Sequence, residues 1–317
     1  MPPAWPGWPG NSSRPPANRP WSCLPAASGR PMIFGIIANT QKEQIWEVLP
    51  PFLAWLESKG ASVLAADDLR ENLCVQPDRF LPIEQLVERC DMVLSFGGDG
   101  TLLSTARKVG RRQTPILGVN LGGLGYLAEI SLSSLYPRVE ELLSGAYRVE
   151  ERMVLACRVN GSPDVYYALN DVVIEKGAYT RVVRIRTTIG GRYLNTYTGD
   201  GLIVATPTGS TAYSLSTGGP LVEPALNVLI VNPISPHTLT DRPMLIGCDQ
   251  GIEALVQGGH DRMILSTDGQ VERHLRVGDR IIIHKADYVV KLVLFHDKYF
   301  YDVLREKLKW GDGPASS

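Results

Sequence analysis

The pattern of apolar residues changes once along the chain, after residue 143, and this change constrains the fold more than any other feature. Before it, short apolar runs alternate with stretches whose apolar residues recur at helical spacing, in the order strand, helix, strand. These segments are residues 33–38, 44–59, 62–65, 92–96, 101–108 and 116–119. The alternation predicts βαβ units and hence an α/β domain. Pro50 and Pro51 lie inside the first helical stretch, so we expect the helix to break there.

A helical stretch at residues 132–143 is followed mainly by short runs rich in β-branched and aromatic residues. The runs are residues 153–159, 171–175, 182–189, 201–205, 228–231, 263–266, 280–284 and 289–295. Helical spacing returns only after Thr208 and at residues 299–310. The predicted fold class is therefore α/β plus β. Its parts are a Rossmann-like α/β domain over residues 32–131, a mostly β domain over residues 132–295 and a closing segment over residues 296–317.

The first thirty residues are rich in Pro, Trp, Ser and Asn, and lack the basic start and continuous apolar stretch of a secretory signal. We predict that residues 1–31 form a disordered N-terminal extension. Met32 directly precedes the first predicted strand, so we expect the natural start there, with a real flexible tail as the alternative. Any peptide from before Met32 in the natively expressed protein would contradict the later start.

The composition excludes several classes of protein. Lys and Arg number 32 against 33 Asp and Glu, for a net charge of -1, which argues against nucleic-acid and membrane partners. No apolar run is long enough to span a bilayer. The five cysteines are scattered without a C-x-x-C pair, which indicates neither disulfides nor zinc and favours a reducing cytoplasm. The five histidines show no metal-binding spacing, so no built-in metal site is expected.

The strongest local signal is the glycine-rich stretch at residues 96–101, which contains Gly97-Gly98-Asp99-Gly100 between a buried strand and a helix. Glycines allow a phosphate to approach the backbone, and amides at a helix start attract an anion. A carboxylate beside a phosphate cradle suggests that Asp99 accepts a proton from an attacking hydroxyl or orients it. The alternative, which the tetrapeptide leaves equally open, is that Asp99 only caps the helix.

Ordinary nucleotide-binding motifs are absent from the sequence. There is no Walker phosphate loop, and Leu103 stands where the dinucleotide fingerprint has its third glycine. A second glycine cluster at residues 120–126 follows the next strand and is expected at the same carboxyl-end edge of the sheet. The alternative is a tight loop that places Tyr126 in the core.

The densest polar stretch, residues 198–220, combines small hydroxyls and glycines with the aromatic Tyr213. Hydroxyls and amides can bind ribose and base edges while the ring offers a flat apolar face, so the stretch predicts a small-molecule site. A turn region without a ligand is the alternative. Asn170-Asp171, at the head of an apolar strand, could bind a ribose diol, cap or turn, and is a weak signal alone.

Taken together and in this order, these motifs resemble the NAD kinase family over residues 32–311. The matching segments are residues 97–101, 120–127, 170–171, 198–219, 268–270 and 299–311. The Gly-Gly-Asp-Gly motif also occurs in diacylglycerol, sphingosine and phosphofructo kinases. The run Thr206-Pro207-Thr208-Gly209-Ser210-Thr211-Ala212-Tyr213 with a later Asp268-Gly269-Gln270 is much more specific.

The resemblance implies an α/β domain and a β-rich domain, the closing segment packing back on the first domain, and NAD bound between the domains of a homo-oligomer, a dimer or tetramer. It makes Asp99 the acceptor of the proton of the adenosine 2′-hydroxyl. Asp200 is expected to meet NAD bound to a neighbouring subunit. The remaining expected ligand-binding residues are Gly100, Asn170, Asp171, Arg181, Thr211, Ala212, Tyr213, Ser214, Leu215, Ser216 and Gln270.

The reaction that the resemblance implies is in-line phosphoryl transfer from ATP or polyphosphate to NAD, which yields NADP. Mg²⁺ or another divalent cation arrives with the phosphates of the donor. Two positions depart from the family pattern. Thr198 leaves the choice of phosphoryl donor open, and Asn227-Val228 affects packing more than chemistry. The alternatives are a kinase of lipid alcohols, which the hydroxyl-rich segment argues against, and a non-catalytic NAD sensor, which would have no use for Asp99.

Overall fold

The computed structural model describes residues 30–73, 76–123, 125–177, 181–258 and 263–310. The predicted N-terminal extension therefore lies outside the described residues, except for its last two. The chain forms two compact units, an α/β unit of residues 30–151 with 290–310, and a β unit of residues 152–289. The units change at residues 151/152 and 289/290, so the helix predicted at residues 132–143 belongs to the α/β unit.

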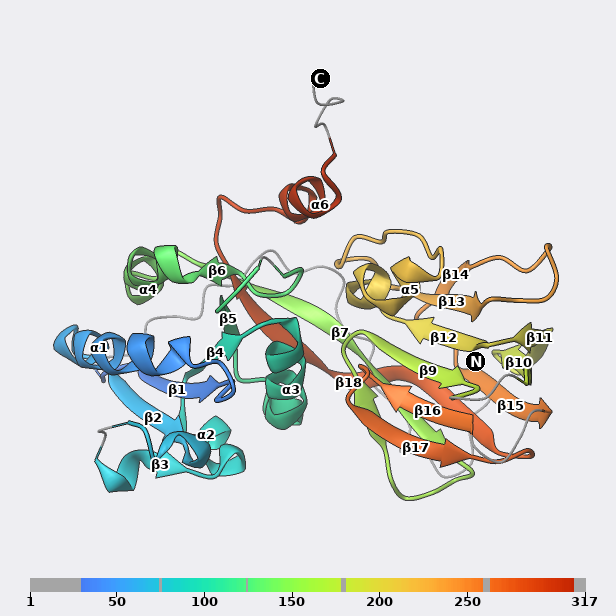
Figure 1. Cartoon of the computed structure of the whole chain (residues 1–317), viewed down its shortest axis with the longest axis horizontal. Coiled ribbons are helices and arrows are strands. Elements are labelled where there is room, and N and C mark those ends of the chain that lie inside the picture. Colours follow the sequence, from blue (N-terminus) through green and yellow to red (C-terminus); the bar gives the residue numbers. More distant parts are fainter. Residues whose placement is uncertain (1–29, 74–75, 124, 178–180, 259–262, 311–317) are drawn as a thin grey trace. The chain divides into compact units, whose positions relative to one another are not determined.

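The α/β unit is built on a parallel sheet in the order β5-β4-β1-β2-β3, as the βαβ alternation predicts (Figure 1). Its strands are β1 Ile33–Ala38, β2 Ser62–Ala66, β3 Phe80–Leu81, β4 Met92–Gly97, β5 Ile116–Asn120 and the short β6 Ile130–Ser131. Its helices are α1 Gln44–Ser58, α2 Ile83–Arg89, α3 Asp99–Val109, α4 Leu135–Leu143 and α6 Phe300–Leu308. Short 3₁₀ turns lie at Asp67–Leu69, Pro77–Arg79, Gly110–Arg112 and Leu132–Ser134.

Neighbouring residues of β4 show which helices cover each face of this sheet, because successive side chains of a strand point to opposite faces. Phe96 packs edge-on against Phe52 of α1, which also contacts Tyr136 of α4. Ser95 points the other way and hydrogen-bonds Thr105 of α3 at 2.9 Å. Helices α1 and α4 therefore share one face of the sheet, and α3 covers the other.

The predicted break at Pro50 and Pro51 is wrong, since α1 continues through both residues. Each proline removes a backbone donor and crowds the preceding turn. Both prolines are exposed, whereas the apolar stripe of the helix, which includes Phe52, is buried. Burial of this stripe favours a continuous helix and offsets the local strain.

The β unit contains an antiparallel sheet in the order β14-β13-β12-β9-β16-β17 and a set of strands in the order β11-β10-β15-β18. The first sheet consists of β9 Asp171–Glu175, β12 Gly201–Ala205, β13 Val228–Ile234, β14 Met244–Gly247, β16 Met263–Thr267 and β17 Val271–Leu275. The others are β7 Arg148–Val159, β8 Tyr166–Ala168, β10 Val183–Ile189, β11 Arg192–Gly199, β15 Ile252–Gly258 and β18 Arg280–Leu294. The helical elements are η5 Thr208–Thr211 and the one-turn α5 Tyr213–Ser216. The prediction of a mostly β part is confirmed.

The central strands of the six-stranded sheet are apolar on both faces. Along β12, Leu202 and Val204 join the large core shared with β10, β15 and the start of β18, whereas Ile203 and Ala205 join a smaller cluster with Val222. This explains why the strands read as continuous apolar runs rather than as an alternation.

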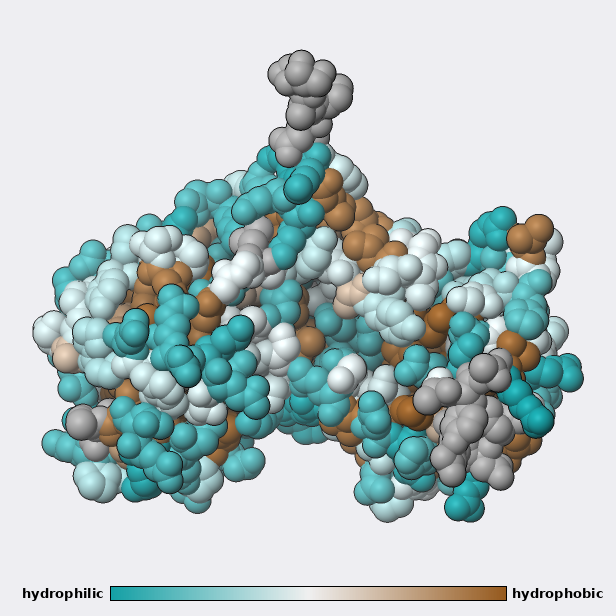
Figure 2. Space-filling view, in the orientation of Figure 1, coloured by the Kyte–Doolittle hydropathy of each residue, from teal (hydrophilic) through white to brown (hydrophobic). Residues whose placement is uncertain are grey.

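Hydrophilic residues cover most of the face seen in Figure 2, with apolar residues scattered between them. Within the described ranges, no helix is long and apolar enough to cross a membrane.

Candidate functional site: two aspartates that bind backbone amides

The glycine-rich stretch forms the turn between β4 and α3. The strand ends at Gly97 and the helix begins at Asp99, two residues before the predicted start at Thr101. Gly97 has no room for a side chain, because a Cβ there would lie 2.1 Å from Oγ1 of Thr101. At Gly98, by contrast, an added Cβ would meet no atom within 4 Å, so the backbone is open on that side.

The Asp99 carboxylate binds three successive backbone amides. Its Oδ2 accepts the N–H of Tyr126 at 2.7 Å, and its Oδ1 accepts those of Leu127 at 3.1 Å and Ala128 at 3.2 Å. Gly98 occupies the N-cap position of α3 and the Asp99 carboxylate binds residues 126–128, so the alternative that Asp99 only caps its helix is wrong.

This contact depends on Gly125. A Cβ at residue 125 would lie 2.0 Å from Oδ1 of Asp99, closer than any two such atoms can approach. Residues 125–128, here called the Asp99-binding loop, therefore reach the carboxylate only because residue 125 has no side chain.

The second glycine cluster lies beside the first, as predicted from the parallel order of β4 and β5. Leu121 donates its N–H to the carbonyl of Gly97 at 3.1 Å. The Asn120 side chain closes the loop by accepting from Gly122 at 2.9 Å and donating to Gly123 at 2.7 Å. Tyr126 is only partly buried, so the alternative that places it in the core is wrong.

A second aspartate, Asp268, repeats the pattern in the β unit. Its Oδ2 accepts the N–H of Leu169 at 2.9 Å, and its Oδ1 accepts those of Asn170 at 2.7 Å and Asp171 at 3.3 Å. Asp268 has a φ of 53° and Gly269 a φ of 62°, a left-handed pair that turns the chain between β16 and β17. The Asn170-Asp171 pair is thus held in place by the Asp268-Gly269 turn.

The carbonyl side of the same pair is bound by the hydroxyl-rich segment. Thr206 donates its N–H to the carbonyl of Asn170 at 2.8 Å and its hydroxyl to that of Leu169 at 2.6 Å. Gly209 packs so closely that an added Cβ would lie 2.1 Å from the Asn170 oxygen. The motifs at residues 170–171, 206–209 and 268–269, far apart in the sequence, therefore form one site.

Asp171 is 3% exposed and lies near a second carboxylate. Burial, and next the charge of Asp268, raise the pKa of Asp171 to about 7, although a hydrogen bond from the Tyr213 backbone opposes the shift. Burial and then Glu272 likewise raise the pKa of Glu175, four residues further along β9 on the same face.

Tyr213 is 40% exposed and stands among these acidic groups. Burial raises the pKa of its hydroxyl, and Glu175, Asp200 and Asp171 add to the shift. A surface with several carboxylates beside an aromatic ring suits a ligand part that donates hydrogen bonds, such as a ribose, better than a phosphate.

The segment that carries Tyr213 is fixed through Ser214. This residue is fully buried, and Asn232 of β13 donates to its carbonyl at 3.0 Å and to Oγ at 3.2 Å. Of the other predicted residues here, Thr211, Ala212 and Leu215 are partly buried and Ser216 is exposed.

The remaining predicted residues lie at turns and at the unit surface. Asp200, between β11 and β12, pairs with Lys176 at 2.6 Å. Arg181 is exposed before β10, and Gln270 is exposed in the turn after β16. Gly100 is exposed in the first turn of α3, in the other unit.

Sequence reasoning did not assign functions to Asp268, Asn232 or Gly125. The Asp268-Gly269 dipeptide is a turn signal, but the three amides that Asp268 binds are about a hundred residues away in the sequence. Gly125 belongs to the second glycine cluster, but no local pattern distinguishes it from the other glycines there or marks Asn232.

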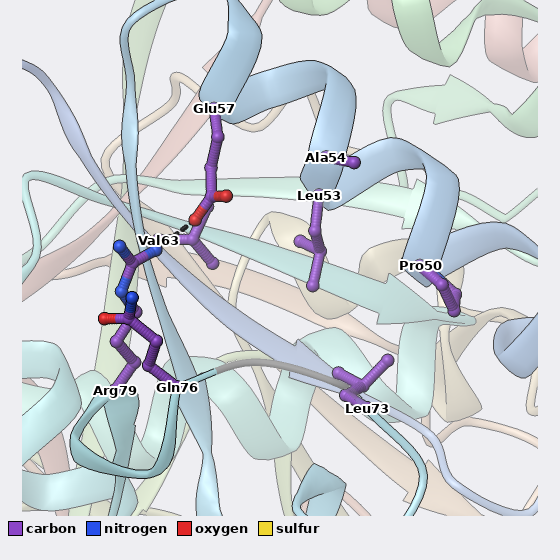
Figure 3. A pocket seen from close by; sticks show the side chains of 8 residues that line it. All are labelled: Pro50, Leu53, Ala54, Glu57, Val63, Leu73, Gln76 and Arg79. Atoms are coloured by element: carbon purple, nitrogen blue, oxygen red, sulfur yellow. Dashed lines mark hydrogen bonds and ion pairs between the residues drawn. The ribbon is translucent and has the colours of Figure 1, made fainter.

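No metal cluster marks the site in the described ranges. The residues described include no group of three or more His, Cys, Asp or Glu that could hold a metal ion. One pocket of about 270 Å³ lies in the α/β unit between α1 and the segment around Gln76 (Figure 3). It is lined by Pro50, Leu53, Ala54, Glu57, Val63, Leu73, Gln76 and Arg79, none of which is a predicted site residue.

Comparison with known proteins identifies the family. Residues 34–147 match the model of the ATP-NAD kinase N-terminal domain, and residues 169–295 match that of the C-terminal domain. The NAD kinase of Geobacter metallireducens is 46% identical over 280 residues, which cover 87% of this chain and 98% of that protein. The chain belongs to the NAD kinase family. Its enzyme class is accordingly NAD kinase (EC 2.7.1.23), a phosphotransferase with an alcohol group as acceptor.

Other relatives agree with this assignment. The NAD kinase of Moorella thermoacetica is 44% identical over 279 residues, 87% of this chain and 89% of that protein. The crystal structure of yeast NADH kinase complexed with NADH matches with a TM-score of 0.83 and 25% identity, over 94% of this chain and 95% of that one. An Archaeoglobus fulgidus NAD kinase in complex with ATP matches with a TM-score of 0.68 and 26% identity, over 88% and 99%. Membership decides against the lipid-kinase and sensor alternatives.

Proposed function

We propose that this NAD kinase uses Asp99 to accept the proton of the adenosine 2′-hydroxyl of NAD while that oxygen attacks the terminal phosphoryl group of the donor. The main support for the proposal is that three backbone amides hydrogen-bond the Asp99 carboxylate and fix its position. A carboxylate offers about four acceptor positions, so a hydroxyl can still donate to it. A base held rigidly at hydrogen-bond distance also keeps the attacking oxygen in line.

The NAD site, in this proposal, is formed by Asn170 and Asp171 together with the segment 211–216. The support is the exposed Tyr213 ring beside carboxylates that can accept from ribose hydroxyls. Yeast NADH kinase, which has the same fold, is complexed with NADH, and this favours a dinucleotide ligand here. Arg181 and Gln270 are proposed as further contacts, and Gly100 as part of the pyrophosphate cradle.

ATP or polyphosphate is the proposed donor, and the ATP complex of the Archaeoglobus fulgidus enzyme supports ATP. The described residues offer no cluster that fits a resident metal ion. We therefore propose that a divalent cation such as Mg²⁺ arrives with the donor, whose phosphate charge it neutralises when bound. No residue of the chain is assigned to it.

A homo-oligomer, dimer or tetramer, is the proposed assembly, with Asp200 meeting NAD of a neighbouring subunit. The ion pair of Asp200 with Lys176 leaves the carboxylate 34% exposed and so open to a ligand. A cytoplasmic location is proposed, because the cysteines are scattered in the sequence and the three within the described residues, Cys90, Cys157 and Cys248, are free thiols.

The direct test is to incubate the purified protein with NAD and Mg²⁺ plus either ATP or polyphosphate, and to detect NADP with an NADP-specific dehydrogenase. We expect NADP with at least one donor. Binding of NAD without any NADP would contradict the proposed reaction. Diacylglycerol offered in place of NAD should give no phosphorylated product.

A further inference from the structure

The Asp99-binding loop is anchored on one side by β5. The loop leads into Glu129, which donates its N–H to the carbonyl of Gly118 at 3.1 Å. Gly118 permits the approach, because a Cβ there would lie 3.0 Å from Cα of Ala128. These contacts fix the end of the loop against β5. The side of Glu129 that faces away from β5 is contacted by other residues.

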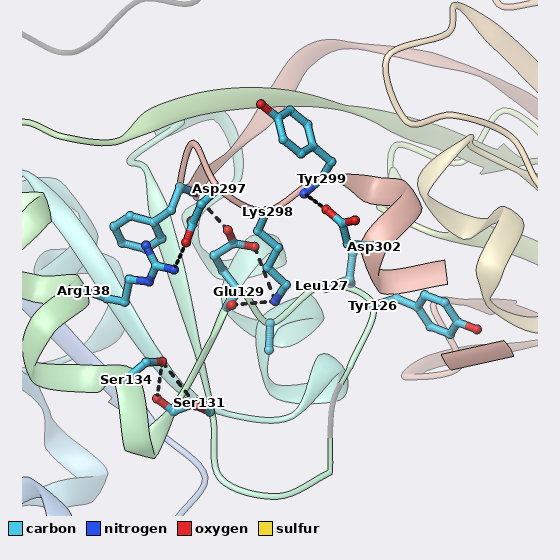
Figure 4. Close-up of polar contacts among 12 residues, drawn as sticks. Tyr126, Leu127, Glu129, Ser131, Ser134, Arg138, Asp297, Lys298, Tyr299 and Asp302 are labelled. Carbon is cyan, nitrogen blue, oxygen red and sulfur yellow. Dashed lines mark hydrogen bonds and ion pairs between the residues drawn. The ribbon is translucent and has the colours of Figure 1, made fainter. Parts of the chain in front are cut away.

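Residues at and after the end of β18 contact Glu129 from this side. The Lys298 ammonium donates to the carbonyl of Glu129 at 2.7 Å and lies 3.9 Å from its Oε2 (Figure 4). Phe295 donates its backbone N–H to Oε1 of the same carboxylate at 3.0 Å. Glu129, which directly follows the loop, is thus bound to a segment more than 160 residues later in the chain.

Further contacts hold the closing segment in register. Arg148 donates to the carbonyls of Lys298 at 3.2 Å and of Phe295 at 3.5 Å. Arg138 pairs with Asp297 at 2.5 Å, and the Lys307 ammonium lies 5.6 Å from the ring centre of Tyr126. The groups whose charges act on Glu129 are Lys298, Arg148 and Arg138, all cationic.

The Glu129 side chain is only 8% exposed, so these contacts differ from a solvated surface ion pair. Burial is the main influence on its carboxyl and raises its pKa, which the Phe295 amide and the three cations counteract. Removing one partner of such a buried charge is strongly unfavourable, whereas a surface pair contributes little.

We propose that Glu129 and Lys298 are positioning residues for phosphoryl transfer, which act by fixing the loop whose amides hold Asp99. The proposal rests on the role of Asp99 given under Proposed function. Neither residue touches substrate; each acts through the backbone of residues 126–128. Because reactive groups misplaced by about 1 Å can lose roughly a hundredfold in rate, loosening this loop should lower kcat without weakening NAD binding.

The test compares Lys298→Met, which removes the ammonium but keeps the apolar stem, with Lys59→Met as matched control. Lys59 belongs to the same unit and pairs with Glu140 at 2.6 Å, away from the loop. For Lys298→Met we expect kcat to fall about 10- to 100-fold, with the Kd for NAD unchanged. Lys298→Arg, which keeps donors and charge, should recover most of kcat, and Lys59→Met should behave like wild type.

Hydrogen exchange gives a readout that does not depend on activity. The amides of Tyr126, Leu127 and Ala128 should exchange at least about tenfold faster in Lys298→Met than in wild type, while amides of β4 keep their protection. If Lys298→Met opens β4 as well, Glu129→Gln replaces it, since this change keeps an oxygen for Phe295 and removes the charge that faces Lys298.

The outcomes separate this proposal from the proposed role of Asp99. If wild type makes NADP but Lys298→Met and Glu129→Gln keep both kcat and loop exchange within about twofold of it, Glu129 and Lys298 do not position the site. If loop exchange rises and kcat does not change, the loop is tied as described but does not serve catalysis, which also overturns the proposal. If Asp99→Asn retains full turnover, the role of Asp99 itself is refuted.

Discussion

Asp99 and Asp268 make the same hydrogen-bonding arrangement, one in each unit: a carboxylate that binds three consecutive backbone amides. Such charge-assisted bonds are stronger than neutral ones and fix a segment that has no regular structure of its own. In the α/β unit this arrangement positions the proposed base, and in the β unit it positions the Asn170-Asp171 pair. The consequence in both cases is a functional group whose geometry depends on a distant residue.

Gly125→Ala tests the first of these contacts. The new Cβ would overlap Oδ1 of Asp99, so the loop or the carboxylate must move. We expect kcat to fall at least about a hundredfold, within the range assigned to loss of a general base. Steady-state kinetics measures this.

The control for folding is Gly123→Ala, whose added Cβ meets no atom within 4 Å and should leave the melting temperature unchanged. Normal turnover of a folded Gly125→Ala enzyme would show that the position of Asp99 is not critical.

Asp171→Asn tests the buried carboxyl group in the β unit. The pKa of Asp171 is raised from 3.8 to about 7, so the folded state binds more protons than the unfolded state between these values. The contribution of Asp171 to wild-type stability is therefore most favourable below pH 4, falls as the pH rises toward 7, and stays reduced above it. Ionisation of the buried group costs on the order of 4 kcal/mol.

Asparagine carries no charge and keeps an oxygen for the Tyr213 backbone. The melting temperature of Asp171→Asn minus that of wild type should therefore increase from pH 5 to pH 8. A difference that is the same at both pH values would argue against a raised pKa.

Among the elements, helix α1 shows how packing overrides a local signal. The face that α1 buries follows from the apolar spacing of the sequence. Its continuity through Pro50 and Pro51 does not, because the stabilising contacts come from β4 and α4. Strands such as β12 were predictable for the opposite reason: residues 201–205 form a continuous apolar run, as in a sheet buried on both faces. Strands β8, β11, β14, β15 and β17 were not among the predicted runs.

Replacing Pro50 and Pro51 by alanine should stabilise the protein. The change restores two backbone donors inside α1 and relieves the contact with the preceding turn, which is worth about 1 to 3 kcal/mol in a helix interior. Chemical denaturation measures the gain, with Ala54→Ser on the exposed side of the same helix as a control that should change little. Destabilisation by the double variant would show that the prolines support a bend that the packing requires.

At the scale of the whole molecule, the proposed functional residues come from both units: Asp99 from the α/β unit, and Asn170, Asp171 and Tyr213 from the β unit. The sequence located each motif, and the order of the motifs along the chain, rather than any one of them alone, pointed to the NAD kinase family. It did not predict which backbone segment each carboxylate binds. Those partners are set by tertiary folding, as with Asp99 and residues 126–128, or Asp268 and residues 169–171.

A mixing experiment tests the proposed sharing of sites between subunits. An Asp99→Asn variant and an Asp200→Asn variant, each with low activity, are unfolded together, refolded and assayed. If Asp200 serves the site of a neighbouring subunit, mixed oligomers contain some intact sites and activity returns to roughly a quarter of wild type for a dimer. Activity no higher than the average of the two variants would place both residues in the same subunit's site.

The most direct test of the central claim is to compare Asp99→Asn with wild type in single-donor assays of NADP formation, with the affinity for NAD measured by calorimetry. Asparagine cannot accept the hydroxyl proton. We predict that kcat falls by about two to four orders of magnitude while the Kd for NAD changes little. A variant that keeps near-normal kcat would contradict the assignment of Asp99 as the proton acceptor.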